Sequence, residues 1–205
     1  MIPTLLFLVG AALGSPSVET ALGGALGGGT PADSWTAITR VGYPSTAVTV
    51  QRGLTDRWTL LTLADTQLFV RAWLGVGVNR RLLSGSAGTV SGELLVGAEG
   101  QADLFPSLGP SSILRLRAAH PGPRFVPYLD VSGRFTVLGQ QVVTELATET
   151  RSERHFWLRI NPAVSGGLGV VITPHWGLEV GLDWMVETAA TVSLPGIHLG
   201  VGVGW

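Results

Sequence analysis

The chain has 205 residues, of which 13% are charged and 45% hydrophobic, with 29 glycines, seven tryptophans and a formal net charge of −1. A soluble domain usually carries about 25% charged residues, and a nucleic-acid-binding protein needs a basic surplus to face phosphates. The composition therefore argues against an ordinary soluble domain and against nucleic acid as a partner. Because there is no cysteine, disulfides, thiolate metal sites and cysteine nucleophiles are excluded.

Two segments precede the first expected strand. Residues 2–13 form a short apolar block followed by small residues, which is typical of a secretory leader, although no Lys or Arg stands in front of it. We expect a signal peptide over residues 1–20, cleaved between Gly14 and Ala21; a short membrane-associated helix is the alternative. Residues 21–34 are rich in Gly and Ala, which predicts a flexible linker without a fold of its own.

From Trp35 onward, hydrophobic residues recur with a period of two, which indicates β-strands. In the stretch "WGLEVGLDWMVE" (176–187), one face carries only apolar side chains and the other carries Glu179, Asp183 and Glu187 among smaller residues. The same alternation is found in five further segments, which are 67–80, 89–104, 112–119, 124–138 and 155–173.

Strand length distinguishes two ways of using this alternation. A soluble β-sandwich would turn the apolar faces inward, but its strands average about five or six residues. Several segments here exceed ten residues, and a membrane-crossing strand needs roughly 9–11. Aromatic residues also mark both ends of the apolar faces, as expected at membrane interfaces. These interface aromatics are Phe125, Phe135, Trp176, Trp184 and Trp205.

The sequence therefore predicts an all-β, antiparallel, up-and-down transmembrane β-barrel over residues 35–205, with eight to ten strands and ten preferred. The turns at 53–57, 120–123 and 173–176 are short, whereas residues 139–154 form a longer polar stretch. Short turns at one rim and long loops at the other are typical of outer-membrane barrels. We expect the short turns on the periplasmic side and the 139–154 loop outside, where it could meet an unknown surface partner. The ten expected strands are 35–43, 46–52, 57–65, 67–80, 89–104, 111–119, 124–138, 155–173, 176–188 and 196–205.

The last strand, "HLGVGVGW", ends on an aromatic residue with apolar residues at alternate positions before it. In this pattern the chain resembles the bacterial outer-membrane β-barrel superfamily as a class, without a motif of a specific family. The resemblance implies a porin-like protein in the outer membrane of a Gram-negative bacterium, in contact with outer-membrane lipid. It also implies that the barrel assembly machinery reads the last strand as an insertion signal. The residues of that signal are Ile197, Leu199, Val201, Val203 and Trp205. The alternating glycines of the same strand are expected to leave lumenal space for arginines or for Trp157.

If the apolar faces meet lipid, the opposite faces line the lumen. A barrel of eight to ten strands is narrow enough to be filled by side chains, and isolated charges inside it would be costly. We therefore expect arginines and carboxylates on adjacent strands to pair, with Arg115 and Arg117 between the strands of Glu93 and Asp130, and Arg159 beside the strand of Glu179. The expected lumenal network is Arg71, Glu93, Glu99, Asp103, Arg115, Arg117, Asp130, Arg134, Arg159, Glu179, Asp183 and Glu187.

This network predicts a non-enzymatic barrel with a structural or interaction role, without cofactor or metal. Two other functions stay open at this point. A narrow pore for water, ions or small solutes would weakly prefer cations, because seven acids face five arginines in the network. A lipid hydrolase would need a nucleophile and a base, for which Ser193, His198 and Glu187 near the outer rim are the candidates, without any supporting motif.

Overall fold

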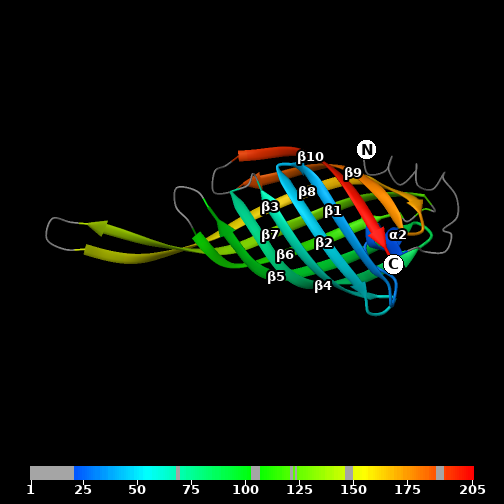
Figure 1. The fold of residues 1–205 in the computed structure, drawn as a ribbon, viewed down its shortest axis with the longest axis horizontal. Coiled ribbons are helices and arrows are strands. Elements are labelled where there is room, and N and C mark those ends of the chain that lie inside the picture. The colour runs from blue at the N-terminus through cyan, green and yellow to red at the C-terminus, as the bar shows by residue number, and fades with distance from the viewer. Residues whose placement is uncertain are drawn as a thin grey trace.

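The computed structural model describes residues 21–67, 70–102, 107–120, 122, 124–145, 150–187 and 192–205. They form a closed barrel of ten antiparallel strands in sequence order, in which the first strand pairs with the last (Figure 1). The predicted barrel and its preferred strand number are thus confirmed. The predicted signal peptide (1–20) and Asp103 lie outside the described residues. The strands are β1 (Trp35–Tyr43), β2 (Ser45–Gly53), β3 (Trp58–Gln67), β4 (Arg71–Gly85), β5 (Gly88–Gln101), β6 (Ser107–Ala119), β7 (Phe125–Glu145), β8 (Thr150–Thr173), β9 (Trp176–Glu187) and β10 (Val192–Gly204).

The period of two in the sequence becomes an outside and an inside of the barrel. On β9 and β10, Leu182 is 67% exposed and Leu199 63% exposed, whereas Glu179 and His198 are buried. Successive side chains of a strand point to opposite faces of the sheet, so the apolar residues of these strands face outward and the polar ones inward. Among the described residues no helix has the length and hydropathy of a membrane span.

The two rims of the barrel differ in strand length rather than in loop length. One rim, which we call the α2 rim, carries the start of β1, the end of β10 and short turns such as Ala87 between β4 and β5 (Figure 1). At the opposite rim Pro44 alone separates β1 from β2. There β7 and β8 continue as a two-stranded hairpin beyond the barrel, paired from Gly139–Phe156 to Glu145–Thr150. Of the expected long loop at 139–154, residues 139–145 and 150–154 are therefore paired strand, and residues 146–149 lie outside the described residues.

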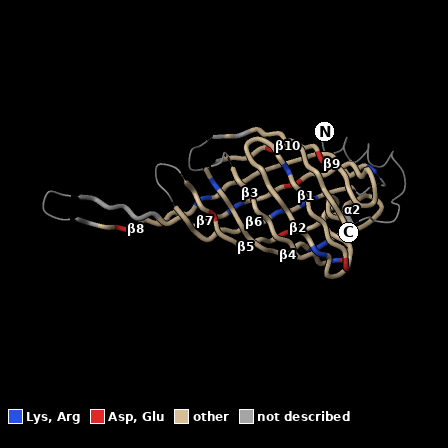
Figure 2. Tube along the Cα trace, in the orientation of Figure 1, with Lys and Arg blue, Asp and Glu red and all other residues tan. Residues whose placement is uncertain are grey.

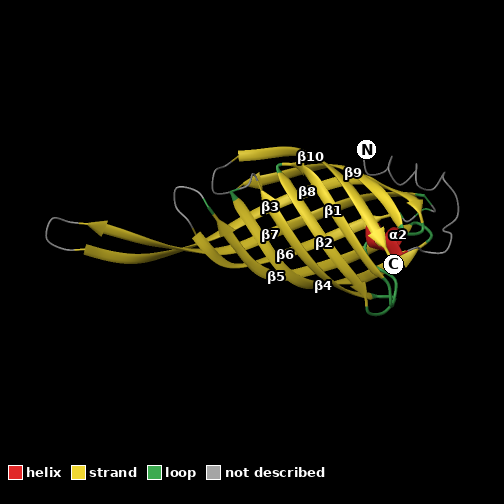
Figure 3. Cartoon of the chain, viewed as in Figure 1, coloured by secondary structure: helices red, strands yellow, loops and turns green. Residues whose placement is uncertain are grey.

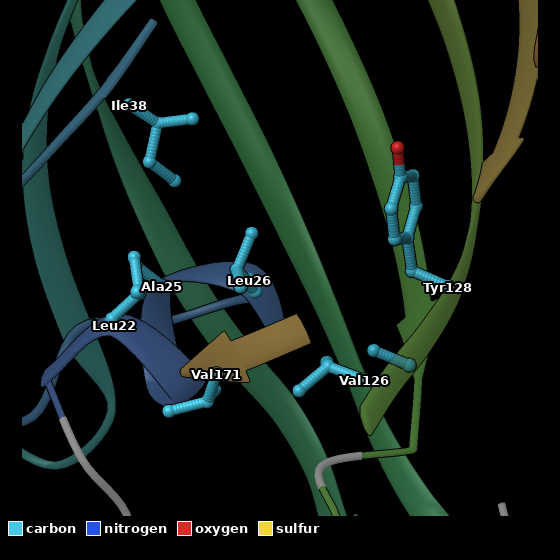
Figure 4. Close-up of a cluster of buried hydrophobic side chains, with 8 residues drawn as sticks. Leu22, Ala25, Leu26, Ile38, Val126, Tyr128 and Val171 are labelled. Atoms are coloured by element: carbon cyan, nitrogen blue, oxygen red, sulfur yellow. The ribbon is translucent and has the colours of Figure 1, made fainter. Parts of the chain in front are cut away.

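The structure also differs from the predicted flexible linker at 21–34. Helix α2 (Ala21–Leu26) lies inside the barrel mouth, and every residue from Leu22 to Thr30 is buried (Figure 3). We call residues 21–32 the lumenal segment. Leu22 and Leu26 pack with Ile38, Val126 and Val171 of the barrel wall (Figure 4).

The linker prediction fails because composition alone does not reveal the surroundings of the segment. Glycine weakens a helix in water, but here Leu22 and Leu26 stand four residues apart and share one helix face. That face is buried against the wall, and burial of apolar surface stabilises the helix. Gly28 has a φ of +100°, and a Cβ on it would lie 2.4 Å from the Ser91 hydroxyl oxygen. Only glycine fits this position, so the Gly-rich composition serves close packing here.

A second apolar cluster occupies the inner face of neighbouring strands β3 to β6. It consists of Leu61, Leu63, Trp73, Leu95 and Ile113. Part of the lumenal surface is therefore apolar. The alternation in the sequence predicts a polar inner face and does not predict this cluster. Charged residues share these strands, with Glu93 and Glu99 on β5 and Arg115 and Arg117 on β6.

Candidate functional site: the charged lumen

Three arginine–carboxylate pairs lie near the inner end of the lumenal segment. In the first, Arg117 on β6 donates from Nε and Nη2 to the two carboxylate oxygens of Asp130 on β7, at 2.7 and 2.6 Å. Arg117 also donates from Nη1 to the Leu26 carbonyl oxygen at 3.1 Å and stacks 4.7 Å from the centre of the Tyr128 ring. Because this arginine caps the end of α2, the pair fixes the lumenal segment as well as the wall.

The second pair joins β1 to β9. Arg40 donates from Nε and Nη2 to Glu179 at 2.8 and 3.1 Å, a bidentate arrangement across the closing seam and β10. The alternation in the sequence predicts that Glu179 lies in the lumen, beside the strand of Arg159, whereas Arg40 is not among the predicted lumenal residues. Ile38 and Arg40 stand two residues apart on β1 and therefore share its inward face. This alternation would have been enough to predict that Arg40 lies in the lumen.

The third pair was expected from the sequence. Arg115 on β6 donates to Glu93 on β5 at 2.8 Å, between strands that are direct neighbours. The expectation that Arg115 and Arg117 bind acids on the two flanking strands thus agrees with the geometry. Cross-strand neighbours lie about 5 Å apart, so the pairing follows from register alone. Figure 2 shows the acidic and basic positions interspersed along the barrel strands.

A further ion cluster reaches across the lumen from β5 to β7 and β8. Glu99 is fully buried and accepts hydrogen bonds from Arg159 and from the Thr136 hydroxyl, the latter at 2.8 Å. Arg134 lies 4.0 Å from Glu99 and binds Asp65 on β3. Arg159 also donates to the Gln101 side chain at 2.8 Å. Arg159 on β8 therefore binds Glu99 on β5, three strands away across the lumen. The expected pairing of Arg159 with the strand of Glu179 is wrong.

His198 on β10 forms a separate polar chain. Its Nδ1 lies 2.7 Å from Asp183, and its Nε2 lies 2.9 Å from the Tyr128 hydroxyl. Ser193, the candidate nucleophile, pairs with Val186 at the opposite rim and is exposed. Glu187 is the last residue of β9. Ser193 and His198 are therefore not arranged as nucleophile and base, since Asp183 and the Tyr128 phenol contact the two nitrogens of the histidine; the side chain of Glu187 lies outside the described residues.

Above the ion pairs the lumen has a polar cavity. It has a volume of about 150 Å³ and reaches the opposite rim at Pro44 and Ser45. Its walls are polar and carry both charges, including Arg115, Arg134 and Asp183. Toward the α2 rim only about 10 Å³ remains between Ala25, Gly28 and the arginines. The described lumen is thus a shallow cup that is open at one rim and filled at the other.

Glycines of the last strands make room for the lumenal segment. A Cβ on Gly202 would lie 2.4 Å from Leu22, and a Cβ on Gly177 would lie 2.9 Å from the same side chain. On Gly200 it would meet Glu179 at 3.0 Å. The lumenal space of "HLGVGVGW" therefore accommodates Leu22 and a carboxylate. The expectation that it accommodates Trp157 is wrong, since that ring is 37% exposed on β8, near the projecting hairpin.

The remaining predicted residues fall in different places. Arg71 is half-buried and starts β4 at the opposite rim. Among the interface aromatics, Phe135, Trp176, Trp184 and Trp205 are exposed on the outside, and Phe125 is half-buried. The apolar residues of the expected insertion signal, including Ile197, Leu199, Val201 and Val203, face outward. Within the described part of the chain, no group of three or more histidines or carboxylates is arranged to hold a metal ion.

No family model matches the sequence, and no curated protein matches it. Three solved structures of similar fold show the distance of the likeness. The N-terminal β-barrel domain of Pseudomonas aeruginosa OprF is 14% identical over 85% of this chain and 98% of that domain, with a TM-score of 0.36. The KdgM porin is 12% identical over 83% and 98%, with a TM-score of 0.40. Neisserial surface protein A is 12% identical over 84% and 96%, with a TM-score of 0.39.

Proposed function

We propose that this chain is an integral outer-membrane β-barrel with a structural or interaction role, whose lumen is closed to solutes. The observation that carries the proposal is the filling of the α2 rim, where Leu22 and Leu26 are at most 1% exposed and Arg117 binds the Leu26 carbonyl. The arginine–carboxylate pairs of the lumen complete the closure. The cup at the opposite rim ends on these pairs.

The outer surface supports a place in a membrane. Trp35, Trp58, Trp176 and Trp205 are exposed around the α2 rim, and Tyr43, Phe135 and Trp184 are exposed nearer the opposite rim. Between them the outside is aliphatic. Amphipathic aromatic rings favour the two membrane–water interfaces, and a β-barrel satisfies all backbone polar groups without a free edge. In this proposal the α2 rim faces the periplasm. The hairpin of β7 and β8 that projects from the opposite rim supports this orientation, because outer-membrane barrels carry their longer extensions on the extracellular side.

A non-enzymatic role agrees with the chemistry of the lumen. Nucleophilic catalysis requires a base in hydrogen-bond reach of a hydroxyl or thiol that can attack a substrate. The nitrogens of His198 contact Asp183 and the Tyr128 phenol, whose ring is itself stacked by Arg117. Both ring nitrogens of His198 are thus engaged by neighbouring side chains of the lumen.

Conductance of the purified protein in a planar lipid bilayer tests the closure. We expect no steady single-channel steps, because the lumenal segment fills the α2 rim and the cavity between Ala25, Gly28 and the arginines has a volume of only about 10 Å³. Insertion is verified in the same preparation by the protection of the strands from protease. Steady steps from inserted protein would reject the closed lumen and support the narrow pore instead, and a preference for cations would then be the expected selectivity.

A further inference from the structure

The outer surface carries two arginines that the lumen does not explain. Arg52 on β2 and Arg80 on β4 are exposed and lie on the outward faces of their strands, among apolar neighbours such as Val50 and Val78. A charged side chain on the lipid-facing side of a barrel is destabilising unless it reaches the interface. Both arginines lie at the α2 rim, close to the ends of their strands.

Each of these arginines is held by a tryptophan on the neighbouring strand. The Arg52 guanidinium carbon lies 5.3 Å from the centre of the Trp35 ring, and that of Arg80 lies 5.2 Å from the centre of the Trp58 ring. The register explains both contacts, since Trp35 is directly opposite Arg52 and Trp58 is directly opposite Arg80. The same device thus occurs twice within four neighbouring strands.

The described surface around the two arginine–tryptophan pairs carries more positive than negative charge. No described carboxylate forms an ion pair with Arg52 or Arg80, whereas the lumenal arginines Arg40, Arg115, Arg117 and Arg134 each bind one. The turn between β2 and β3 adds Arg57 and Asp56, and Arg81 turns inward to the Gly29 carbonyl. Asp33, which precedes β1, is the other described acid at this part of the rim. Two guanidinium groups therefore face outward at the rim without an acidic partner.

We propose that these two arginine–tryptophan pairs form a binding site for the phosphate of anionic phospholipids on the outside of β1 to β4. The inference rests on the membrane placement given under Proposed function, but not on the closure of the lumen. A guanidinium that stacks on a ring keeps its N–H edges free for a phosphate, and bidentate contacts to phosphate are strong. The tryptophan rings hold the arginines at the depth of the headgroups.

Binding of dioleoyl phosphatidylglycerol, measured by native mass spectrometry and by titration in neutral detergent, tests this site. We expect the wild type to retain phosphatidylglycerol in preference to dioleoyl phosphatidylcholine. The double variant Arg52→Gln/Arg80→Gln is expected to bind phosphatidylglycerol about thirtyfold more weakly, because each of the two basic residues near a membrane surface contributes about 1 kcal/mol of attraction to anionic lipid.

Arg124→Gln provides the matched control. Arg124 is also exposed at the α2 rim, before β7, and contacts no tryptophan in the described structure. This variant is expected to bind phosphatidylglycerol as the wild type does. If Arg124→Gln weakens binding as much as the double variant, the attraction is diffuse and the proposed site is wrong. Unchanged binding by the double variant would also overturn it. Both outcomes are independent of bilayer conductance, since Arg52 and Arg80 lie outside the lumen.

Discussion

At the scale of single residues, the lumen is a set of buried charges that are tolerated because each is paired. Glu99 shows this most clearly, since it is fully buried and faces Arg159, Arg134 and the Thr136 hydroxyl. Removing one member of a buried ion pair is far more costly than replacing both members by apolar groups. The pair is therefore expected to specify how the strands meet rather than to add much stability.

Glu99→Gln tests this view. The change leaves the buried Arg159 guanidinium without its anion, so we expect the free energy of unfolding to fall by about 3–5 kcal/mol. The measurement is urea unfolding in detergent, followed by the gel mobility of the folded barrel. Glu153→Gln, with a side chain that is 45% exposed on the hairpin, is the control and should leave the unfolding midpoint unchanged.

The double variant Glu99→Leu/Arg159→Met separates burial of an unpaired charge from loss of packing. It should recover most of the lost stability, since it removes both charges at similar volume. Equal stability of Glu99→Gln and the control would show that Arg159 does not depend on Glu99.

The sequence predicts the inward face of these residues but only part of their pairing. Arg115–Glu93 and Arg117–Asp130 join adjacent strands, so alternation and strand order suffice to foresee them. Arg159–Glu99 and Arg134–Asp65 cross the lumen, and such contacts depend on the diameter and stagger of the barrel. No local pattern in the sequence carries that information.

At the scale of elements, α2 is a helix because of its surroundings in the barrel and not because of its composition. Six residues with two glycines would not form a stable helix in water, yet Ala25 is 1% exposed within the barrel. The number and order of the strands, in contrast, follow from the sequence because their period of two is local. Several predicted bounds differ from the observed ones by four to seven residues, and the largest difference is at the end of β7, predicted at 138 and observed at Glu145. The polar composition of residues 139–154 predicts a loop, but β7 and β8 stay paired as a hairpin as far as Glu145 and Thr150.

Cysteine labelling tests whether the lumenal segment is packed. The chain has no cysteine, so single substitutions can be followed without background. We expect Ala25→Cys to react with a bulky maleimide at least about tenfold more slowly than Asp56→Cys, because labelling requires local opening of the packed segment. Asp56 lies exposed in a turn at the same rim. After unfolding, both variants should react alike; equal rates in the folded protein would support the flexible linker.

At the scale of the whole molecule, the closed sheet and its aliphatic outside define how the protein should behave in a cell. The side chains on the outside of the barrel include Leu74, Leu182 and Leu199, each more than 60% exposed. Large contiguous apolar surfaces are rare on soluble monomers. Lipid is the solvent that such a surface matches.

Fractionation of a Gram-negative host that expresses the full chain checks this expectation. We expect the protein in the outer-membrane fraction, retained after a high-salt wash and released by detergent, because its attachment is apolar rather than ionic. A folded barrel should also migrate differently from the boiled protein on a denaturing gel. Recovery as a periplasmic protein without detergent would contradict the membrane placement.

The position of the lumenal segment has a consequence for the order of assembly. The segment leads directly into β1, and β1 closes the barrel by pairing with β10 from Thr36–Gly204 to Tyr43–Ile197. Leu22 packs against Gly177 and Gly202 of the last two strands and with Ile38 of the first. Its binding surface is therefore complete only when the two ends of the sheet have met. Docking of residues 21–32 and closure of the seam between β1 and β10 are therefore expected to be coupled, since the packing surface of the segment is incomplete while the seam is open.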